Sequence, residues 1–193
     1  FRGINTEYFD NSNITSDKVK NFYSSIKISS ENFKILLPGR LTRWKGQEMF
    51  IEALGILKNK YNKENFQAII LGSHQGRKVY FKKLISLVEK HKLKDKFFFL
   101  QHVKEMPVAY YISDVVVSAS IEPEAFGRIS VEAQSMRRPI LASNHGGSTE
   151  TIINGKSGFL FNNNNSESLA ENLNNLMEMD KDKLQSIGNE GRK

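Results

Sequence analysis

The chain has 193 residues, of which 39% are hydrophobic and 25% are charged, a composition that suits one globular domain able to bury a core. No apolar run approaches the roughly 20 residues that a membrane-spanning helix needs, and the absence of cysteine excludes disulfides and thiolate chemistry. The formal net charge of +7 favours a polyanionic partner, which could be nucleic acid, anionic lipid or a phosphorylated small molecule. Because the chain begins at Phe1 and not at Met, we expect it to be a piece of a longer protein.

The predicted elements alternate between short apolar strands and amphipathic helices. Residues 1–30 are polar, rich in Asn and Ser and carry little periodicity, so no element is predicted there. An apolar run then begins at Phe33 and ends at Pro38-Gly39, which indicates a buried strand that enters a loop. Strands are predicted over residues 33–37, 67–71, 97–100, 115–118, 139–142 and 158–161. Helices are predicted over residues 46–60, 106–113, 127–137, 149–153 and 166–179, and around the apolar stripe 81, 84, 85 and 88.

This alternation predicts an α/β fold with a Rossmann-like, doubly wound parallel sheet. The strands are continuous apolar runs without the period-two pattern of a half-exposed sheet, so helices should cover both faces. Such sheets bind ligands in the crevice at the carboxyl ends of their strands. Gly39, Gly72, Ser118 and Ser143 stand at or just beyond predicted strand ends, which places the informative loops along one edge.

The strongest motif runs from Glu124 to Glu132, where the predicted fourth strand passes through a Pro-containing loop into a helix. A helix N-terminus offers unpaired N–H groups and partial positive charge, which suit a phosphate, and Gly127 lets a ligand approach the backbone. Glu132 should lie roughly 8 Å along the helix at ~1.5 Å per residue, where its carboxylate suits the hydroxyls of a ribose. Glu124 lies where a transferred sugar would sit, although either glutamate alone could be an ordinary surface carboxylate.

A second motif follows the predicted first strand directly. Gly39 provides a tight turn, and Arg40 and Lys45 supply two cations at the same crevice. The fixed fork of arginine and the mobile ammonium of lysine together suit a diphosphate. Arg43 is a third and less specific cation, and this loop taken alone could be no more than a basic surface turn.

Together these motifs resemble the C-terminal domain of glycosyltransferase family 4, whose two-domain architecture is called GT-B. Glu124 and Glu132 match the family's two glutamates with seven residues between them. Gly39-Arg40 and Lys45-Gly46 match its Gly-Arg turn followed by Lys-Gly. Further matches span nearly the whole chain and comprise Arg2-Gly3, Gly72, Val103, Asp114, Gly146-Gly147, Glu150, Asn154-Gly155, Gly158 and Phe159.

The resemblance implies a role for each matched site residue. Arg40 and Lys45 would bind the donor diphosphate and neutralise the charge that develops on the leaving group. Glu124 would hold the donor sugar and Glu132 the ribose, while Val103 would contact the base through its backbone. The remaining donor-binding positions would be Gly39 in the turn and the backbone N–H groups of Phe126, Gly127 and Arg128.

The implied activity is retaining, metal-independent transfer of a glycosyl group from a UDP, GDP or ADP sugar, with no cofactor or metal site. The sequence around Glu124 resembles that of bacterial members that build lipopolysaccharide or surface polysaccharide. Residues 1–30 would lead in from the interdomain linker, and residues 31–193 would form the nucleotide-sugar-binding domain. The N-terminal domain, with the catalytic histidine and the site for a lipid-linked or saccharide acceptor, and the final C-terminal helix would lie outside this chain. The chain alone should therefore catalyse little, and its parent enzyme is expected in the cytoplasm or at the inner face of the cell membrane.

The same residues bear on several alternative functions. A nucleotide-sugar epimerase of GT-B shape and a non-catalytic nucleotide-sugar-binding module both stay open. A dinucleotide-dependent oxidoreductase and a P-loop phosphotransferase are disfavoured because their glycine motifs are absent. Nucleic-acid binding is disfavoured because residues 97–99, three phenylalanines, fall in a predicted buried strand. The basic stretch 77–96 is interpreted as a solvated helix face, with contact to anionic headgroups as the alternative, and His145 could touch the donor whereas His102 is interpreted as an ordinary histidine.

Overall fold

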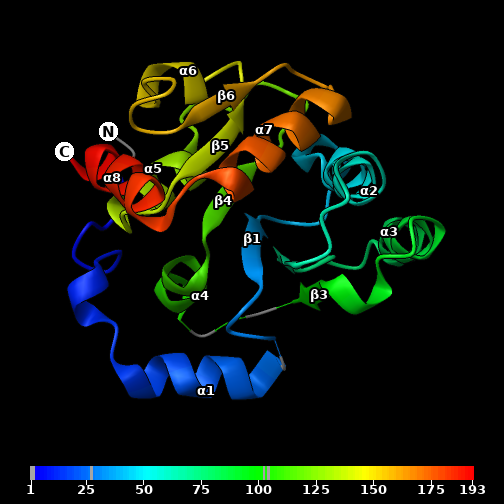
Figure 1. Cartoon of the computed structure of the whole chain (residues 1–193), viewed down its shortest axis with the longest axis horizontal. Coiled ribbons are helices and arrows are strands. Elements are labelled where there is room, and N and C mark those ends of the chain that lie inside the picture. The colour runs from blue at the N-terminus through cyan, green and yellow to red at the C-terminus, as the bar shows by residue number, and fades with distance from the viewer. Residues whose placement is uncertain (1–2, 27, 102, 104) are drawn as a thin grey trace.

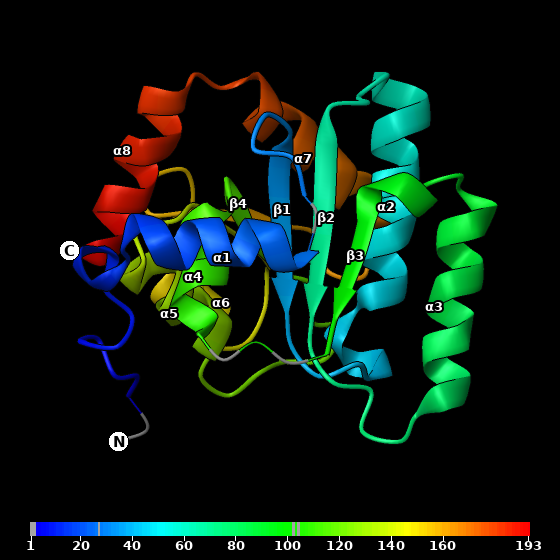
Figure 2. The ribbon, with the colours of Figure 1, turned by 90° about the horizontal axis from the view of Figure 1, so that it is seen from below.

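The computed structural model describes residues 3–26, 28–101, 103 and 105–193, so Arg2 and His102 lie outside the described residues. A six-stranded sheet forms its centre, and all neighbouring strands pair in parallel, as the apolar runs predicted. The strand order is β3-β2-β1-β4-β5-β6, so the winding direction reverses between β1 and β4. The strands are β1 (Phe33–Pro38), β2 (Phe66–Leu71), β3 (Phe97–Leu100), β4 (Val115–Ser118), β5 (Ile140–Ser143) and β6 (Phe159–Phe161). Figure 2 shows β1, β2 and β3 running side by side toward the same edge.

Helices cover both faces of the sheet (Figure 1). One face carries α2 (Gln47–Tyr61), α3 (Lys78–Lys90) and α7 (Ser166–Glu178). The other carries α1 (Ser16–Ile26), α4 (Met106–Ile112) and α5 (Arg128–Ser135), while α8 (Lys181–Arg192) packs against α5. Successive side chains of a strand point to opposite faces, so Ile35 and Leu37 enter the first core and Leu36 the second.

Short helical elements complete the chain. They are α6 (Ser148–Thr151) and the 3₁₀ turns η1 (Asn11–Asn13), η2 (Arg43–Lys45) and η3 (Lys94–Lys96). Within the described residues, no helix combines the length and the apolar character needed to cross a bilayer.

The N-terminal segment contains a helix that the sequence analysis did not predict. Along α1, Val19, Phe22, Tyr23 and Ile26 follow helical spacing and pack into the core beneath β1 and α4. Phe9 is buried in the same core, 5% exposed. The stripe was present in the sequence but was obscured by the polar residues around it. The segment 1–30 therefore packs, in its described part, as an integral layer on the sheet.

The helix α8 was also not predicted, because its buried face is made partly of glycine. Leu184 and Ile187 pack inward, and Gly188 meets the backbone of the turn after α5. A Cβ atom at Gly188 would lie 2.1 Å from the carbonyl oxygen of Arg137, so no larger residue fits there. Near its end, Arg192 pairs with Asp10 at 2.8 Å and thereby ties the helix to the N-terminal segment.

The strand β3 corrects one prediction. It lies at an edge of the sheet, and of its aromatic side chains only Phe97 is buried, whereas Phe98 and Phe99 are partly exposed. An apolar run cannot distinguish a central strand from an edge strand that a helix covers. Here α3 covers β3, and the ring of Phe81 packs against that of Phe99.

Candidate donor site

Two loops meet at the point where the strand order reverses, between β1 and β4. The first loop links β1 to α2, and the second links β4 to α5. A Cβ atom at Gly46, which has φ +68°, would lie 1.9 Å from the carbonyl oxygen of Ala119, so only glycine allows this approach. The backbone N–H of Ile121 also donates to the carbonyl oxygen of Trp44 at 2.8 Å. Both predicted motifs are therefore held together at the crevice where doubly wound sheets bind ligands.

The contact between the loops carries an ion pair. Lys45 Nζ lies 2.7 Å from Oε1 of Glu124, and the two side chains are 16% and 25% exposed. The hydroxyl of Ser120 donates to the same carboxylate oxygen. Lys45, predicted to bind phosphate, and Glu124, predicted to bind sugar, are thus direct partners that a ligand can still reach.

Arg40 lies on the same loop as Lys45 but is exposed. Its guanidinium group stands 5.7 Å from the centre of the Trp44 ring, within the range of a cation–π contact. Its backbone carbonyl accepts a hydrogen bond from the amide of Gln47 at 2.9 Å, which fixes the loop while leaving the guanidinium on the surface. Gly39 precedes it with φ +140°, and a Cβ atom at this position would lie 3.6 Å from the Lys45 side chain.

Glu132 occupies a different environment on α5. It is 7% exposed, and both of its oxygens have donors. The Tyr110 hydroxyl donates to Oε2 at 2.7 Å, and the Arg128 guanidinium donates to Oε1 at 2.8 Å. Burial, reinforced by the neighbouring carboxylate, raises the pKa of Tyr110 well above its ordinary value, so this phenol stays a hydrogen-bond donor.

The start of α5 faces the same crevice. Gly127 caps the helix in the left-handed conformation, with φ +65°. Among the described residues, no hydrogen bond occupies the backbone N–H groups of Phe126, Gly127 or Arg128. The loop after β5 closes this side, because the N–H of Gly147 donates to the Glu124 carbonyl at 2.7 Å. His145 in that loop contacts the carbonyl oxygen of Ser120 at 2.7 Å.

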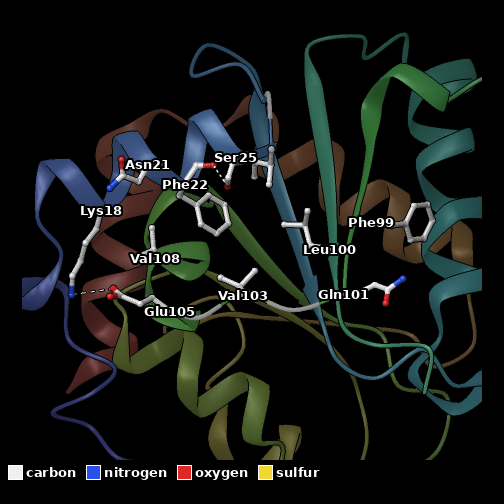
Figure 3. Close-up of a pocket in the computed structure, with 11 residues that line it drawn as sticks. Lys18, Asn21, Phe22, Ser25, Phe99, Leu100, Gln101, Val103, Glu105 and Val108 are labelled. Carbon is white, nitrogen blue, oxygen red and sulfur yellow. Dashed lines mark hydrogen bonds and ion pairs between the residues drawn. The ribbon is translucent and has the colours of Figure 1, made fainter. Parts of the chain in front are cut away.

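Val103 lies apart from this cluster, after β3. It lines a cleft of about 560 Å³ between α1 and the β3–α4 connection. Figure 3 shows Val103 and Phe22 on opposite sides of this cleft, with Lys18 and Glu105 paired at 3.0 Å at one end. The cleft therefore combines an apolar floor with a polar margin.

Two residues that contact the glutamates were missed by the sequence analysis. Ser120 stands four positions before Glu124, at the start of the loop that precedes the motif, and a lone serine there carries no distinctive pattern. Tyr110 is 22 positions from Glu132 on another helix, and only the fold brings the pair together. No local signal in the sequence could have identified Tyr110.

Comparison with known proteins decides the family. The family model described as Glycosyl transferases group 1 matches residues 19–193. The chain belongs to this family. Its Rossmann-like sheet is the architecture of the GT-B glycosyltransferases among its structural neighbours.

Three similar proteins define this group 1 chain further. The capsular polysaccharide biosynthesis glycosyltransferase CapM of Staphylococcus aureus is 25% identical over 100% of this chain and 48% of its own length. A glycosyltransferase from Rickettsia africae superposes with a TM-score of 0.93 at 34% identity, covering 99% of this chain and 50% of that one. HepE of Anabaena, solved in complex with UDP-glucose, superposes with a TM-score of 0.88 at 26% identity, covering 100% of this chain and 50% of HepE. The chain spans about half the length of each of these proteins.

Proposed function

We propose that this chain is the nucleotide-sugar-binding half of a retaining glycosyltransferase. The observation that carries the proposal is the meeting of Lys45, Glu124 and the start of α5 at the crevice between β1 and β4. Cations, a reachable carboxylate and unoccupied N–H groups are the groups that a sugar diphosphate needs. The similarity to HepE, which was solved with UDP-glucose, supports the same ligand class.

In this proposal the donor exchanges one set of ion pairs for another. Lys45 leaves part of its contact with Glu124 and, with Arg40, neutralises the diphosphate as the bond to the sugar breaks. Glu124 then accepts hydrogen bonds from the sugar hydroxyls, close to where Lys45 held it. The N–H groups of Phe126, Gly127 and Arg128 point their partial positive charge at the same phosphates.

The nucleoside end of the donor is assigned to Glu132 and Val103. Glu132 accepts hydrogen bonds from the ribose after the exposed Arg128 side chain, 72% exposed, moves off its outer oxygen. Val103 contacts the base through its backbone at the mouth of its cleft.

The wider role is also a proposal. Similarity to CapM, a capsular polysaccharide biosynthesis glycosyltransferase, supports a role in surface polysaccharide synthesis. Lipopolysaccharide as the alternative product and a lipid-linked or saccharide acceptor are further parts of the proposal. The acceptor site and the catalytic histidine belong to an N-terminal domain in this proposal, so the chain alone binds donor but transfers little. The complete enzyme would act in the cytoplasm, at the inner face of the membrane where the basic surface meets anionic headgroups.

Ligand-observed NMR of this chain tests the proposal. UDP, GDP and ADP are compared first, followed by the common sugar conjugates of whichever nucleotide binds. We expect one nucleotide to bind more tightly than the other two, and Lys45→Ala to weaken its binding. Lys63→Ala, which removes a surface ion pair with Glu178, should leave the binding unchanged. Failure of all three nucleotides to bind the folded chain would refute the donor site.

A further inference from the structure

A second cleft lies beside the donor site, on the outer side of the same two loops. Its volume is about 580 Å³, and it opens between η2, the turn before α3 and the β4–α5 loop. The residues that line it are Thr42, Arg43, Trp44, Gly76, Arg77, Lys78, Val79, Tyr80, Lys83 and Glu122. We call it the Trp44 cleft.

The Trp44 cleft shares its walls with the donor site. Arg43 and Trp44 directly precede Lys45, and Glu122 stands two residues before Glu124. Trp44 carries the Arg40 guanidinium near its ring and also lines the cleft, so it stands between the two sites. A molecule in the cleft would therefore lie next to a sugar held by Glu124.

Positive charge dominates the lining. The lining contains four cations and one carboxylate, Glu122; the cations are Arg43, Arg77, Lys78 and Lys83. Within the part of the chain that the structure describes, only Lys83 of these four cations has an ion-pair partner, Glu48 at 2.5 Å. Arg77 and Lys78 also stand at the first turn of α3, which contains no acidic residue. Cations are unfavourable at the positive end of a helix, and an anion in the cleft would remove that repulsion.

The lining also offers groups suited to a sugar ring. The Trp44 side chain is 40% exposed and Val79 is 84% exposed, so an apolar surface remains open beside the cations. Thr42 is only 5% exposed, and its hydroxyl oxygen has no hydrogen-bond partner among the described residues. An aromatic face with polar groups around it is amphipathic, as a pyranose ring is.

We propose that the Trp44 cleft binds an acidic saccharide beside the donor sugar, as a subsite that this chain adds to the acceptor site of the proposed N-terminal domain. The shared chemistry is a carboxylate or phosphate on a sugar ring, with the anion at Arg77 and Lys78 and the ring against Trp44. The acceptor role rests on the proposed function, whereas the binding of an acidic saccharide does not.

The single tryptophan of the chain makes the test direct, because Trp44 is the only source of tryptophan emission. The chain is titrated with trigalacturonate, glucose 6-phosphate and maltotriose, each with and without saturating UDP, and with vesicles of phosphatidylglycerol. We expect a saturable change with at least one of the two acidic sugars and none with neutral maltotriose. Trigalacturonate and glucose 6-phosphate distinguish a carboxylate from a phosphate as the recognised group.

A matched pair of variants separates the cleft from net charge. Arg77→Ala with Lys78→Ala removes two cations of the cleft, and Lys82→Ala with Lys90→Ala removes two exposed cations of the same helix that do not line it. The first pair should lower the affinity for the acidic sugar about ten-fold or more, and the second pair should lower it less than about two-fold. UDP affinity should stay the same in both pairs, measured by NMR.

Three outcomes overturn the proposal. No response to either acidic sugar, equal weakening in both variant pairs, or a response to vesicles alone would each show that the cleft does not select a saccharide. If an acidic sugar binds at Trp44 but no nucleotide binds the chain, the acceptor role falls together with the proposed function. If nucleotides bind and acidic sugars do not, only the Trp44 cleft proposal fails.

Discussion

Glu124 and Glu132 are eight positions apart in the sequence, yet the fold gives them different environments. Glu124 is held by Lys45 from another loop and stays 25% exposed. Glu132 is held by Tyr110 from a neighbouring helix, and its side chain is 10% exposed. The first contact joins two loops that a ligand can part, whereas the second is built into the helical layer.

This difference gives the two carboxylates different roles. Glu132 is held in one orientation, whereas Glu124 can exchange its partner Lys45 for a ligand. The partly exposed ion pair of Lys45 and Glu124 costs less to open than a buried one, because water screens the two charges as they separate. A buried carboxylate that accepts a phenolic hydrogen bond keeps its orientation before any ligand arrives. We therefore expect Glu124 and Lys45 to rearrange with the donor, and Glu132 to act as a fixed acceptor.

The largest effect is expected from removing the cations that would bind the donor diphosphate. In the two-domain enzyme that we propose, replacing Lys45 by Ala should lower kcat by about 10²- to 10³-fold, because charge on the leaving diphosphate loses its partner. Arg40→Ala should act in the same direction. Steady-state kinetics and thermal unfolding are measured together. Unchanged turnover in a stably folded variant would remove these residues from the mechanism, and Lys63→Ala is the control for loss of a surface cation.

The next effect concerns the carboxylate of the same pair. Glu124→Ala should lower sugar transfer by about 10²-fold if its hydrogen bonds strengthen in the transition state. Binding of the nucleoside diphosphate to this chain should change little, since that ligand lacks the sugar. Calorimetry with the diphosphate and with the sugar conjugate checks this. A large loss of diphosphate affinity would assign Glu124 to the nucleotide.

A smaller effect is expected at the fixed carboxylate. Glu132→Ala should weaken nucleotide binding roughly 10- to 100-fold, the range for lost hydrogen bonds to a charged group. Glu132→Gln keeps an acceptor for Tyr110 and separates loss of charge from loss of the contact. If Glu132→Ala spares nucleotide affinity while Glu124→Ala abolishes it, the two assigned roles are reversed.

Tyr110→Phe tests whether the buried contact positions Glu132. The change removes one hydroxyl without altering the ring, so the unfolding free energy should fall by about 1 kcal/mol. Nucleotide affinity should fall only a few-fold, since the Glu132 carboxylate stays in place on α5 and loses only one of the contacts that orient it. Chemical denaturation and calorimetry measure both effects. Full nucleotide affinity in Tyr110→Phe would reduce the contact to a purely structural one.

The smallest expected effect is on alkaline stability. The folded state raises the pKa of Tyr110, so the native protein keeps a proton that the unfolded chain releases above about pH 10. The contribution of Tyr110 to the free energy of unfolding should therefore be fully present below that pH and should decline as the pH rises further. Tyr110→Phe should decline less steeply than the parent chain in denaturation curves at pH 9 to pH 11. Parallel curves would contradict this source of the decline.

Much of the fold follows from local patterns. The six apolar runs predicted the strands to within about a residue, because a strand buried on both faces must be apolar throughout. The loops that carry Lys45 and Glu124 were predicted for the same edge, because parallel strands all end there. The helices α1 and α8 were not predicted. Polar residues surround the apolar stripe of α1, and Gly188 forms part of the buried face of α8.

The sequence by itself determined the class of sheet, the edge that carries the candidate site and the two glutamates at family spacing. Only the tertiary structure decided which groups touch. Lys45 and Glu124 are 79 positions apart, and they meet because β1 and β4 are neighbours in a strand order that apolar runs do not encode. The contact of Tyr110 with Glu132 and the Trp44 cleft likewise depend on how helices and loops pack around that order. Local periodicity records what each segment buries, and it carries no information about the neighbour against which it is buried.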